Sequence, residues 1–388
     1  MFGVGSTWGH EERVAGASTS SNVPPPPKYG LRKDHKVVPP GEEQNGPDVR
    51  PICGAKEAPN SKFSHFLSML INHYADCAEH KNECKSSEEM RVGFEEFNNL
   101  NAEMREKCQL ISMDVKALYP SMKWSEIIKA VKEMILKSPM VIENVDWAAV
   151  ARYIAVHVPQ EEIDAEGLGL VIPKRKKTRT RRITVNYLRN KKNDDTWTVA
   201  RKPGVRQKKK LLALAITVGV QTVMSGHTYR IGDTVYLQTE GGPIGLELTG
   251  AVSRPFMQKW DLLYLEKIRV AGILMRMYKR YVDDSNQIAV VPEPGSRYDE
   301  NTGRVISDGQ GLGAEVEEDE RLAWILKGIA NTVMEGIEME AEYPSKTRRG
   351  KMAILDMEAW LEGSTVLYQH YEKPMASKAV LNAQSATT

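Results

Sequence analysis

The chain has 388 residues, of which 41% are hydrophobic and 27% charged, and its formal net charge is +2. This composition is that of an ordinary folded protein with room for two or three domains or subdomains, and it excludes a polycation. No apolar run approaches the ~20 residues of a membrane span, and the N-terminus carries no secretory signal. The four cysteines therefore point to an intracellular, reducing location with free thiols.

The N-terminal part combines a low-complexity tail with helix-like segments. Residues 1–28 contain a serine-rich run and four consecutive prolines, which predicts disorder or a polyproline-like conformation. Apolar residues at helical spacing predict a helix over 64–78, and residues 88–108 also read as helix. Residues 110–115 read as a buried strand, and the next helix is expected over 125–136 with Ser125 as its N-cap.

The segment from 173 to 210 is the strongest charge anomaly of the chain. Two β-like runs, 183–188 and 196–200, flank a polar tip and predict a basic hairpin. A solvated loop or a nuclear-import signal would explain the same composition, but such charge density favours contact with a nucleic-acid backbone. The cationic residues expected to make that contact are Lys174, Arg175, Lys176, Lys177, Arg179, Arg181, Arg182, Lys208, Lys209 and Lys210.

The second half of the chain alternates helices, hairpins and loops. A helix is expected over 211–224, then a hairpin that turns at Gly232 and Asp233, a Gly/Pro loop over 240–245 and a helix over 249–268. Strand-like runs at 275–282 and 287–291 place Asp283 and Asp284 at the tip of a hairpin. The segment 292–320 reads as an exposed acidic loop. A helix over 321–337, strands over 338–342 and 352–360, and a frayed end complete the pattern.

Three carboxylates mark a candidate metal site. Asp114 ends the strand at 110–115, and Asp283 and Asp284 follow Tyr281 and Val282 in a four-residue string. Acids from two distant strands can hold two divalent cations about 3.5–4 Å apart for phosphoryl transfer. Mg²⁺ prefers such carboxylate oxygens, and Mn²⁺ can substitute for it. Because paired aspartates are also common in turns, an ordinary turn remains the alternative explanation.

In order along the chain, these motifs resemble those of reverse transcriptases, and within them the Penelope-like retroelements. The resemblance covers roughly residues 29–378. The segments that carry it are Tyr29–Lys36, Arg50–Cys53, Asp114–Ser121, Tyr236–Gly245, Arg280–Asp284, Ile354–Asp356 and Tyr368–Pro374. It implies an α+β right-hand polymerase with an antiparallel palm sheet backed by helices. It also implies RNA-directed DNA polymerase activity with an RNA template, a DNA primer and deoxynucleotides as partners, and a nuclear location.

The resemblance assigns roles to individual residues. It makes Asp114, Asp283 and Asp284 the catalytic metal ligands for two Mg²⁺ ions, with Asp284 the supporting member. Tyr119 would exclude the 2′-hydroxyl of a ribonucleotide, although a core tyrosine would look the same. The other nucleotide-binding residues implied are Arg50, Lys36, Gln238, Ile244 and Gly245, and the candidate general acid is Lys346. A surface arginine, a simple turn and a solvated lysine are the alternatives.

The same resemblance implies a domain order and shows departures. The tail at 1–28 precedes fingers and N-terminal palm at 29–109. The palm covers 110–376 with its basic insert and acidic loop, and 377–388 begins a thumb that is largely absent. In relatives the loop at Tyr236–Gly245 continues with two Ser-Pro pairs and ends in Asn, whereas this chain runs on through Glu247 to Arg254. Relatives also carry a thumb and often a nuclease domain, which here would be a separate partner.

Three functional hypotheses therefore remain open on sequence grounds. The first is an RNA-templated DNA polymerase of a retroelement. The second is an RNA-templated RNA polymerase, which usually shows Gly-Asp-Asp and lacks an aromatic residue at the position of Tyr119. The third is a catalytically degenerate nucleic-acid-binding relic, which Glu247 and Arg254 in unusual places would favour.

Overall fold

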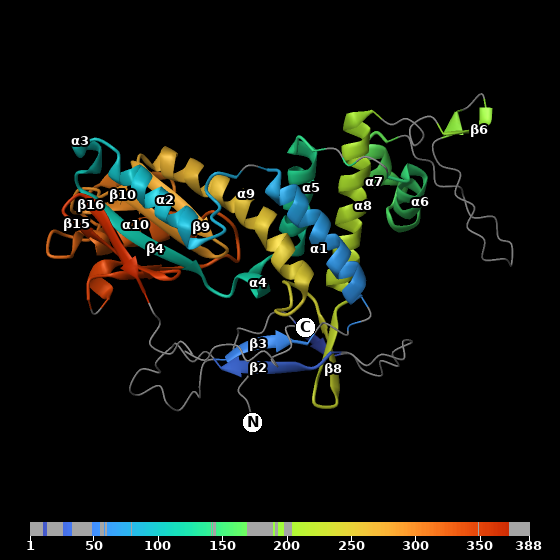
Figure 1. Ribbon diagram of the computed structural model, residues 1–388, viewed down its shortest axis with the longest axis horizontal. Helices are drawn as coiled ribbons and strands as arrows, with labels where there is room; N and C mark the ends of the chain where they lie inside the picture. The colour runs from blue at the N-terminus through green and yellow to red at the C-terminus, as the bar shows by residue number, and fades with distance from the viewer. Residues whose placement is uncertain are drawn as a thin grey trace. The chain divides into compact units, whose positions relative to one another are not determined.

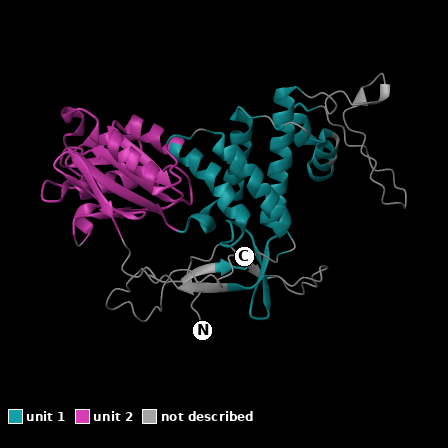
Figure 2. Cartoon of the chain, in the orientation of Figure 1, with its two compact units in different colours: residues 1–29, 52–81, 117–261 teal, residues 30–51, 82–116, 262–388 magenta. Residues whose placement is uncertain are grey.

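The computed structural model (Figure 1) describes residues 11–13, 26–32, 49–54, 58, 60–78, 80–140, 142, 145–168, 189–190, 193–197, 204–347 and 349–371. It combines helices with antiparallel sheets, which confirms the expected α+β class. The chain divides into two compact units, residues 1–29, 52–81 and 117–261 against residues 30–51, 82–116 and 262–388 (Figure 2). We call them unit 1 and unit 2.

Unit 1 is a helical unit with a small sheet. Its elements are β1 (Glu11–Arg13), α1 (Ser61–Asp76), α4 (Leu118–Ser121), α5 (Trp124–Lys137), α6 (Trp147–His157), α7 (Gln160–Ala165), β5 (Arg189–Asn190), β6 (Asn193–Trp197), α8 (Val205–Ser225), β7 (Thr228–Ile231), β8 (Thr234–Gln238) and the first part of α9 (Glu247–Ala271). Helix α8 contacts α1, α5 and α6. Most of its run from Leu211 to Met224 is buried, because helices pack against it on several sides.

Part of the expected N-terminal tail is paired in unit 1. Strand β1 pairs antiparallel with β8, whose other edge pairs with β7. On the far edge of β7, the carbonyl of Pro26 accepts a hydrogen bond of 3.0 Å from the Arg230 N–H. A two-stranded hairpin leaves unpaired N–H and C=O groups on both edges, and these segments satisfy them. The remainder of the tail lies outside the described residues.

Unit 2 is built on an antiparallel sheet. Its elements are α2 (Ser87–Asn98), α3 (Ala102–Arg105), β4 (Cys108–Val115), β9 (Met275–Tyr281), β10 (Asp284–Val290), β11 (Ser296–Asp299), β12 (Arg304–Ser307), α10 (Glu318–Ala330), β13 (Met339–Glu342), the 3₁₀ turn η3 (Pro344–Lys346), β14 (Met352–Ile354), β15 (Met357–Glu362) and β16 (Thr365–His370). Strands β2 (Lys28–Arg32) and β3 (Val49–Cys53) pair with each other. The central sheet has the order β13-β4-β10-β9.

The two faces of the central sheet are covered differently. On one face Gln287 of β10 accepts a 2.8 Å hydrogen bond from the Tyr264 hydroxyl of α9, and α10 contacts β4 and β13. On the other face Leu110, Met277 and Ile288 join a core with α2 and the small sheet of β14, β15 and β16. This second core covers one end of the sheet, toward the start of β4. The carboxyl end of β4 carries an exposed Asp114.

Several expected boundaries were wrong. The segment 88–108 forms two helices because the Asn101 side chain accepts a hydrogen bond from the Met104 N–H and begins α3. Helix α5 begins at Trp124 with Lys123, not Ser125, at the N-cap. Strands β5 and β6 lie where the polar tip of the basic hairpin was expected, and residues 183–188 and 198–200 lie outside the described part. The expected strand over 352–360 is broken at Leu355, whose φ is +57°.

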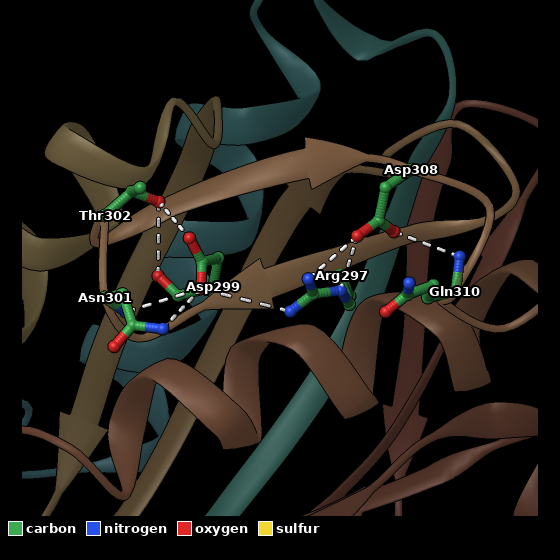
Figure 3. A network of polar contacts seen from close by, with 6 residues as sticks. All are labelled: Arg297, Asp299, Asn301, Thr302, Asp308 and Gln310. Carbon is green, nitrogen blue, oxygen red and sulfur yellow. Dashed lines mark hydrogen bonds and ion pairs between the residues drawn. The ribbon is translucent and has the colours of Figure 1, made fainter.

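The segment expected to be an acidic loop contains a hairpin of its own. Strands β11 and β12 pair from Ser296 with Ser307 to Asp299 with Arg304. Figure 3 shows the polar network that closes it, in which Arg297 pairs with Asp308 at 2.8 Å. Hydrogen bonds from the Thr302 hydroxyl lower the pKa of Asp299, and the Gln310 N–H lowers that of Asp308. The charges of Arg297 and Asp308 are therefore largely compensated within the hairpin.

None of the described helices is long and apolar enough to cross a membrane.

Candidate functional site

The sheet register of unit 2 brings the three predicted aspartates together. Asp114 is the next-to-last residue of β4, and Asp284 is the first residue of β10. The antiparallel ladder pairs Met113 with Ser285, so Asp114 and Asp284 lie opposite each other at the same end of the adjacent strands β4 and β10. The Ser285 hydroxyl also donates a 3.1 Å hydrogen bond to the Met113 carbonyl, which ties the strands immediately beside the acids.

The hairpin tip is tighter than the sequence predicted. Tyr281 pairs with Asp284, so only Val282 and Asp283 form the turn, and β10 has already begun at Asp284. Val282 has a φ of +55°, a left-handed conformation that is uncommon for a β-branched residue. Such strain persists only where neighbouring structure holds it, and it is often found at functional sites. The two aspartates therefore occupy different structural positions, one in the turn and one in the strand.

The three carboxylates form a group that fits a divalent cation. One ligand oxygen from each of Asp114, Asp283 and Asp284 lies within 4.8 Å of the others. Asp114 is exposed and the other two are half-buried. Within the described residues, no other three His, Cys, Asp or Glu side chains converge in this way. Hard carboxylate oxygens are the donors that Mg²⁺ and Mn²⁺ prefer, and like charges held this close favour a cation between them.

Arg280 belongs to the motif Arg280–Asp284, and its side chain supports the hairpin turn, a role that the resemblance did not assign. Its side chain is buried, with 1% exposure, and its Nη1 donates a 2.6 Å hydrogen bond to the Val282 carbonyl. Its backbone is also held, because its N–H donates to Asn82 and its carbonyl accepts from Cys84, both at 2.7 Å. An arginine inside the strand-like run that leads to the paired aspartates, three residues before Asp283, is the sequence signal that could have revealed it.

Lys346, the candidate general acid, lies in η3 of the same unit. Its Nζ donates a 3.1 Å hydrogen bond to the Ala341 carbonyl and stands over the Tyr343 ring. Ala341 is the register partner of Met113, which precedes Asp114. The buried Asp319 holds the turn, since it accepts hydrogen bonds from the Ser345 N–H and hydroxyl at 2.6 and 2.7 Å. The lysine is thus anchored on the strand that flanks β4.

In unit 1, glycines hold the loop at the end of the Tyr236–Gly245 motif against neighbouring backbone. Gly245 has a φ of +109°, and a Cβ there would stand 2.1 Å from the Cys53 carbonyl oxygen. Gly241 has a φ of +68°, and its Cβ would stand 2.4 Å from the Pro120 carbonyl oxygen. The Cys53 N–H also donates a 2.7 Å bond to Ile244. Only glycine permits such approaches, so the loop shape depends on these positions.

The same loop contacts the segment that carries Tyr119. The Gly242 N–H donates to the Tyr119 carbonyl at 2.7 Å, and the Trp124 indole donates to the Gly241 carbonyl at 2.7 Å. Gln238 is buried, and its side-chain amide donates to the Glu240 carbonyl at 3.0 Å. The structure therefore joins Tyr119, Gln238, Ile244 and Gly245 in one region of unit 1.

The residues that depart from the expected loop pattern fasten α9 to α1 in unit 1. Glu247 pairs with His65 at 2.8 Å, and Arg254 donates to Asn72 and Asp76 at 3.1 and 3.0 Å. A cavity of about 310 Å³ beside Gly245 is lined by Ser61, Lys62, Ser64, His65, Gly245, Leu246 and Glu247. These unusual side chains therefore have structural partners.

The remaining predicted residues are less fully placed. Arg50 lies in β3, but its side chain is outside the described part, as are Lys36 and the basic residues from 174 to 182. At the start of α8, Lys209 donates to the Ser138 carbonyl and Lys210 donates to the Glu166 carbonyl at 2.7 Å. Lys208 stands over the Trp147 ring at 5.8 Å. The contacts of Lys209 and Lys210 place positive charge at the carboxyl ends of α5 and α7.

Comparison with solved structures identifies the architecture. Telomerase from Candida albicans in complex with a TWJ fragment of telomeric RNA matches 94% of this chain with a TM-score of 0.50 and 10% identity. Apo telomerase from Candida tropicalis matches 93% with a TM-score of 0.49 and 9% identity. The fold is reverse-transcriptase-like. The chain spans about half the length of these structures, 49% and 50%.

At such low identity the likeness concerns the reverse-transcriptase-like fold alone. No family model matches the chain, and no curated protein matches it. Within this fold the aspartate hairpin and the acid at the end of β4 belong to the antiparallel sheet of unit 2.

Proposed function

We propose that this protein copies an RNA template into DNA by two-metal nucleotidyl transfer. The observation that carries the proposal is the convergence of Asp114, Asp283 and Asp284 within 4.8 Å at one end of the antiparallel sheet. The order of the sequence motifs and the reverse-transcriptase-like fold support it. The Candida albicans telomerase, which shares this fold, was solved in complex with a fragment of telomeric RNA.

Asp114 and Asp283 are the principal cation ligands in this proposal, and Asp284 supports them. A bound pair of Mg²⁺ ions would lower the pKa of a primer 3′-hydroxyl and neutralise charge on the triphosphate. The protein's own contribution is placement of the reactants and of negative charge. Arg280 contributes by holding the carbonyl of Val282, and thereby the turn in which Asp283 stands.

The other predicted residues handle the nucleotide and the nucleic acid. Tyr119 selects deoxynucleotides, and Gln238, Ile244 and Gly245 line the nascent base pair. Arg50 and Lys36 hold the incoming phosphates through charge-assisted hydrogen bonds. Lys346 donates a proton to the departing pyrophosphate. The basic residues from 174 to 182 and from 208 to 210 bind the phosphate backbone of template and primer.

We further assign the protein to a retroelement of the Penelope-like kind. The support is the resemblance of Tyr236–Gly245 and Tyr368–Pro374 to that branch. A nuclease, in a further domain or a separate partner, would open the target DNA. Such a cycle acts on chromosomal DNA, which places the protein in the nucleus.

Primer extension tests the proposal directly. An oligo(dT) primer on poly(rA) is incubated with Mg²⁺ or Mn²⁺ and either dTTP or UTP. We expect incorporation of dTTP alone and a loss of at least about 10³-fold in Asp283→Asn, because the variant removes charge from the cation site. The matched control is Asp233→Asn, which alters an exposed aspartate in the turn between β7 and β8.

The other outcomes separate the alternative functions. UTP incorporation by the unaltered protein would indicate an RNA-templated RNA polymerase. No incorporation of either nucleotide, with RNA binding that weakens as salt increases, would indicate a binding relic. If dTTP is used, Tyr119→Ala should admit UTP as well, and an unchanged preference would remove Tyr119 from the selection of the sugar.

A further inference from the structure

Helix α1 of unit 1 exposes large apolar side chains on the side that faces solvent. Its other side packs against α5 and α8 (Figure 1). Phe63, Phe66 and Met69 nevertheless are 37%, 50% and 52% exposed, and Leu70 is half-buried. The other three lie three or four residues from Phe66, so on a helix they are its neighbours and form one surface. We call these four residues the α1 patch.

Cationic side chains continue the α1 patch along the helix. Lys62, Phe66, Met69 and His73 follow one another at positions i, i+4, i+7 and i+11, which places them in one line on the solvent side. Within the described residues, the Lys62 ammonium has no ion pair or hydrogen bond. Lysine is depleted at the centres of protein–protein interfaces. A free ammonium beside an exposed ring therefore favours a polyanionic partner over a protein.

The acids near this side of α1 already have partners. Asp76 is the single acidic residue of the helix, and it pairs with Arg254 at 3.0 Å. Glu247 of α9 accepts from His65 at 2.8 Å. These contacts leave the free charge of Lys62 unopposed on the outward side of α1. The charge of the surface thus complements a phosphate backbone.

The line of side chains begins at the cavity beside Gly245. Lys62 lines this cavity of about 310 Å³, together with Gly245 and Leu246. The volume lies at the lower end of the ~300–1,000 Å³ of small-ligand sites, which suits a single base. In the proposed function the loop at Gly245 lines the nascent base pair. Template bases that have yet to be copied reach such a loop unpaired.

The two phenylalanines of the α1 patch have different surroundings. Phe63 lies against α8, since a Cβ added at Gly219 would meet its ring at 3.1 Å. Phe66 has half of its surface exposed and stands in line with Lys62 and Met69. Phe63 is therefore part of the packing between helices, and Phe66 is the ring that is free to contact a ligand.

We propose that the α1 patch is a stacking surface for the unpaired part of the RNA template. Proteins hold single strands by stacking bases on aromatic side chains while cations contact the phosphates. Phe66 supplies the ring, the thioether of Met69 packs against the edge of a base, and Lys62 contacts a phosphate. The inference rests on the proposed function for the identity of the strand, and it adds the place where that strand is held before it is copied.

Binding of two labelled nucleic acids to the full chain tests the proposal without requiring polymerase activity. One is a blunt RNA–DNA hybrid, and the other is the same hybrid with a single-stranded RNA extension. Fluorescence anisotropy gives the Kd of each. Phe66→Leu should weaken binding of the extended hybrid about tenfold, because it removes stacking and keeps an apolar side chain. Its Kd for the blunt hybrid should stay within about twofold.

Two further variants separate stacking from a general effect of an exposed apolar residue. Phe66→Trp keeps a ring and should bind the extended hybrid within about twofold of the unaltered protein. Trp324→Leu is the matched control, because it removes a 45% exposed ring from α10 of unit 2. Its Kd values should not change. Equal losses in Phe66→Leu and Trp324→Leu, or equal losses on the blunt and extended hybrids, would overturn the proposal.

Salt dependence tests the phosphate contact. Each phosphate contact to a single strand contributes about 0.7 to the slope of log K against log salt concentration. Lys62→Gln should therefore lower the slope for the extended hybrid by about 0.7. An unchanged slope would contradict the proposal.

Photocrosslinking tests the same surface in the unaltered protein, so its result does not depend on the folding of a variant. The RNA extension carries 4-thiouridine, and the crosslinked peptide is identified by mass spectrometry. We expect the adduct within residues 62–73. Adducts confined to other segments would overturn the proposal.

The remaining outcomes separate this inference from its alternatives. If Phe66→Leu binds RNA as the unaltered protein does but no longer self-associates in sedimentation, the α1 patch contacts a second copy and the proposal falls. If Phe66→Leu weakens binding of the extended hybrid and no primer is extended, the inference stands and the polymerase proposal falls. If primer extension succeeds and the Phe66 variants bind the extension normally, only the inference falls.

Discussion

The candidate residues of unit 2 and those of unit 1 are held in place by different means. In unit 2, hydrogen-bonded ladders between β4, β10 and β13 set the acids, and the side chains face outward from a regular sheet. In unit 1, Gly241 and Gly245 let an irregular loop approach backbone carbonyls that any side chain would meet. Strand register tolerates many substitutions, whereas a glycine contact with backbone tolerates almost none.

The largest expected effect of a substitution on stability is in the loop of unit 1. Gly245→Ala should cost more than about 3 kcal/mol, because the new Cβ would clash with the Cys53 carbonyl and φ is unfavourable. Gly232→Ala is the control: its φ is +59°, but nothing lies within 4 Å of the added Cβ, so only about 1 kcal/mol is expected. Denaturant unfolding measures both. Equal losses would show that conformation, and not the close approach, makes the loop depend on glycine.

The next effect concerns the hairpin of unit 2. Arg280→Lys should lower kcat for primer extension on the order of 10²-fold, because the turn at Val282 loses its support and the acid is misplaced. The KM for dTTP should change little. Arg276→Lys, at the other end of β9, is the control and should retain most activity. A Kd for Mn²⁺ that is unchanged in Arg280→Lys would contradict a role in holding the cation site.

Protonation provides a third test, because a buried histidine lies in unit 1. Burial and, to a smaller extent, Lys28 lower the pKa of His227 to about 4. The unfolded chain binds this proton near pH 6.5, so stability rises with pH between about 4 and 6.5 and falls as pH drops through that range. We expect this group to remove about 2–3 kcal/mol of unfolding free energy at pH 4 relative to pH 7.

His227→Gln isolates this contribution from that of the carboxylates. The variant should lose much of the stability change between pH 7 and pH 4.5, measured by urea unfolding at each pH. His73→Gln, at an exposed position of α1, should retain the full change. If His227→Gln and the unaltered protein change in parallel, His227 is not held neutral in the folded state.

The smallest expected effect is at the start of α8. Lys210→Met should cost about 0.5–1 kcal/mol, because its ammonium group donates to the Glu166 carbonyl at a helix end. If Lys210 also contacts phosphate, the salt dependence of RNA binding should fall by about one unit of slope. Lys208→Met, whose ammonium stands over an indole ring, is the comparison for stability. An unchanged slope in Lys210→Met would assign that lysine to structure alone.

Local patterns allowed many elements to be predicted, and the reason differs between them. The apolar run of α8, the hairpin turn at Gly232 and the strand that carries Asp114 near its carboxyl end depend on neighbouring residues, so their positions were recognisable. The split of 88–108 at Asn101 and the break at Leu355 were missed, because a cap and one left-handed residue override an otherwise regular pattern. The hairpin of β11 and β12 was missed because its sequence is polar and resembles a loop. In the structure, ion pairs within the hairpin compensate its charges.

The candidate site shows the same division at the level of single residues. The sequence by itself determined which acids could bind a cation, since Asp114, Asp283 and Asp284 follow strand-like runs in a characteristic order. Only the tertiary structure decided that their oxygens lie within 4.8 Å and that Arg280 supports the turn. Pairing of strands that are far apart in the chain is set by long-range register and by the core that covers one face. Neither the register nor the covering core can be predicted from a local run of residues.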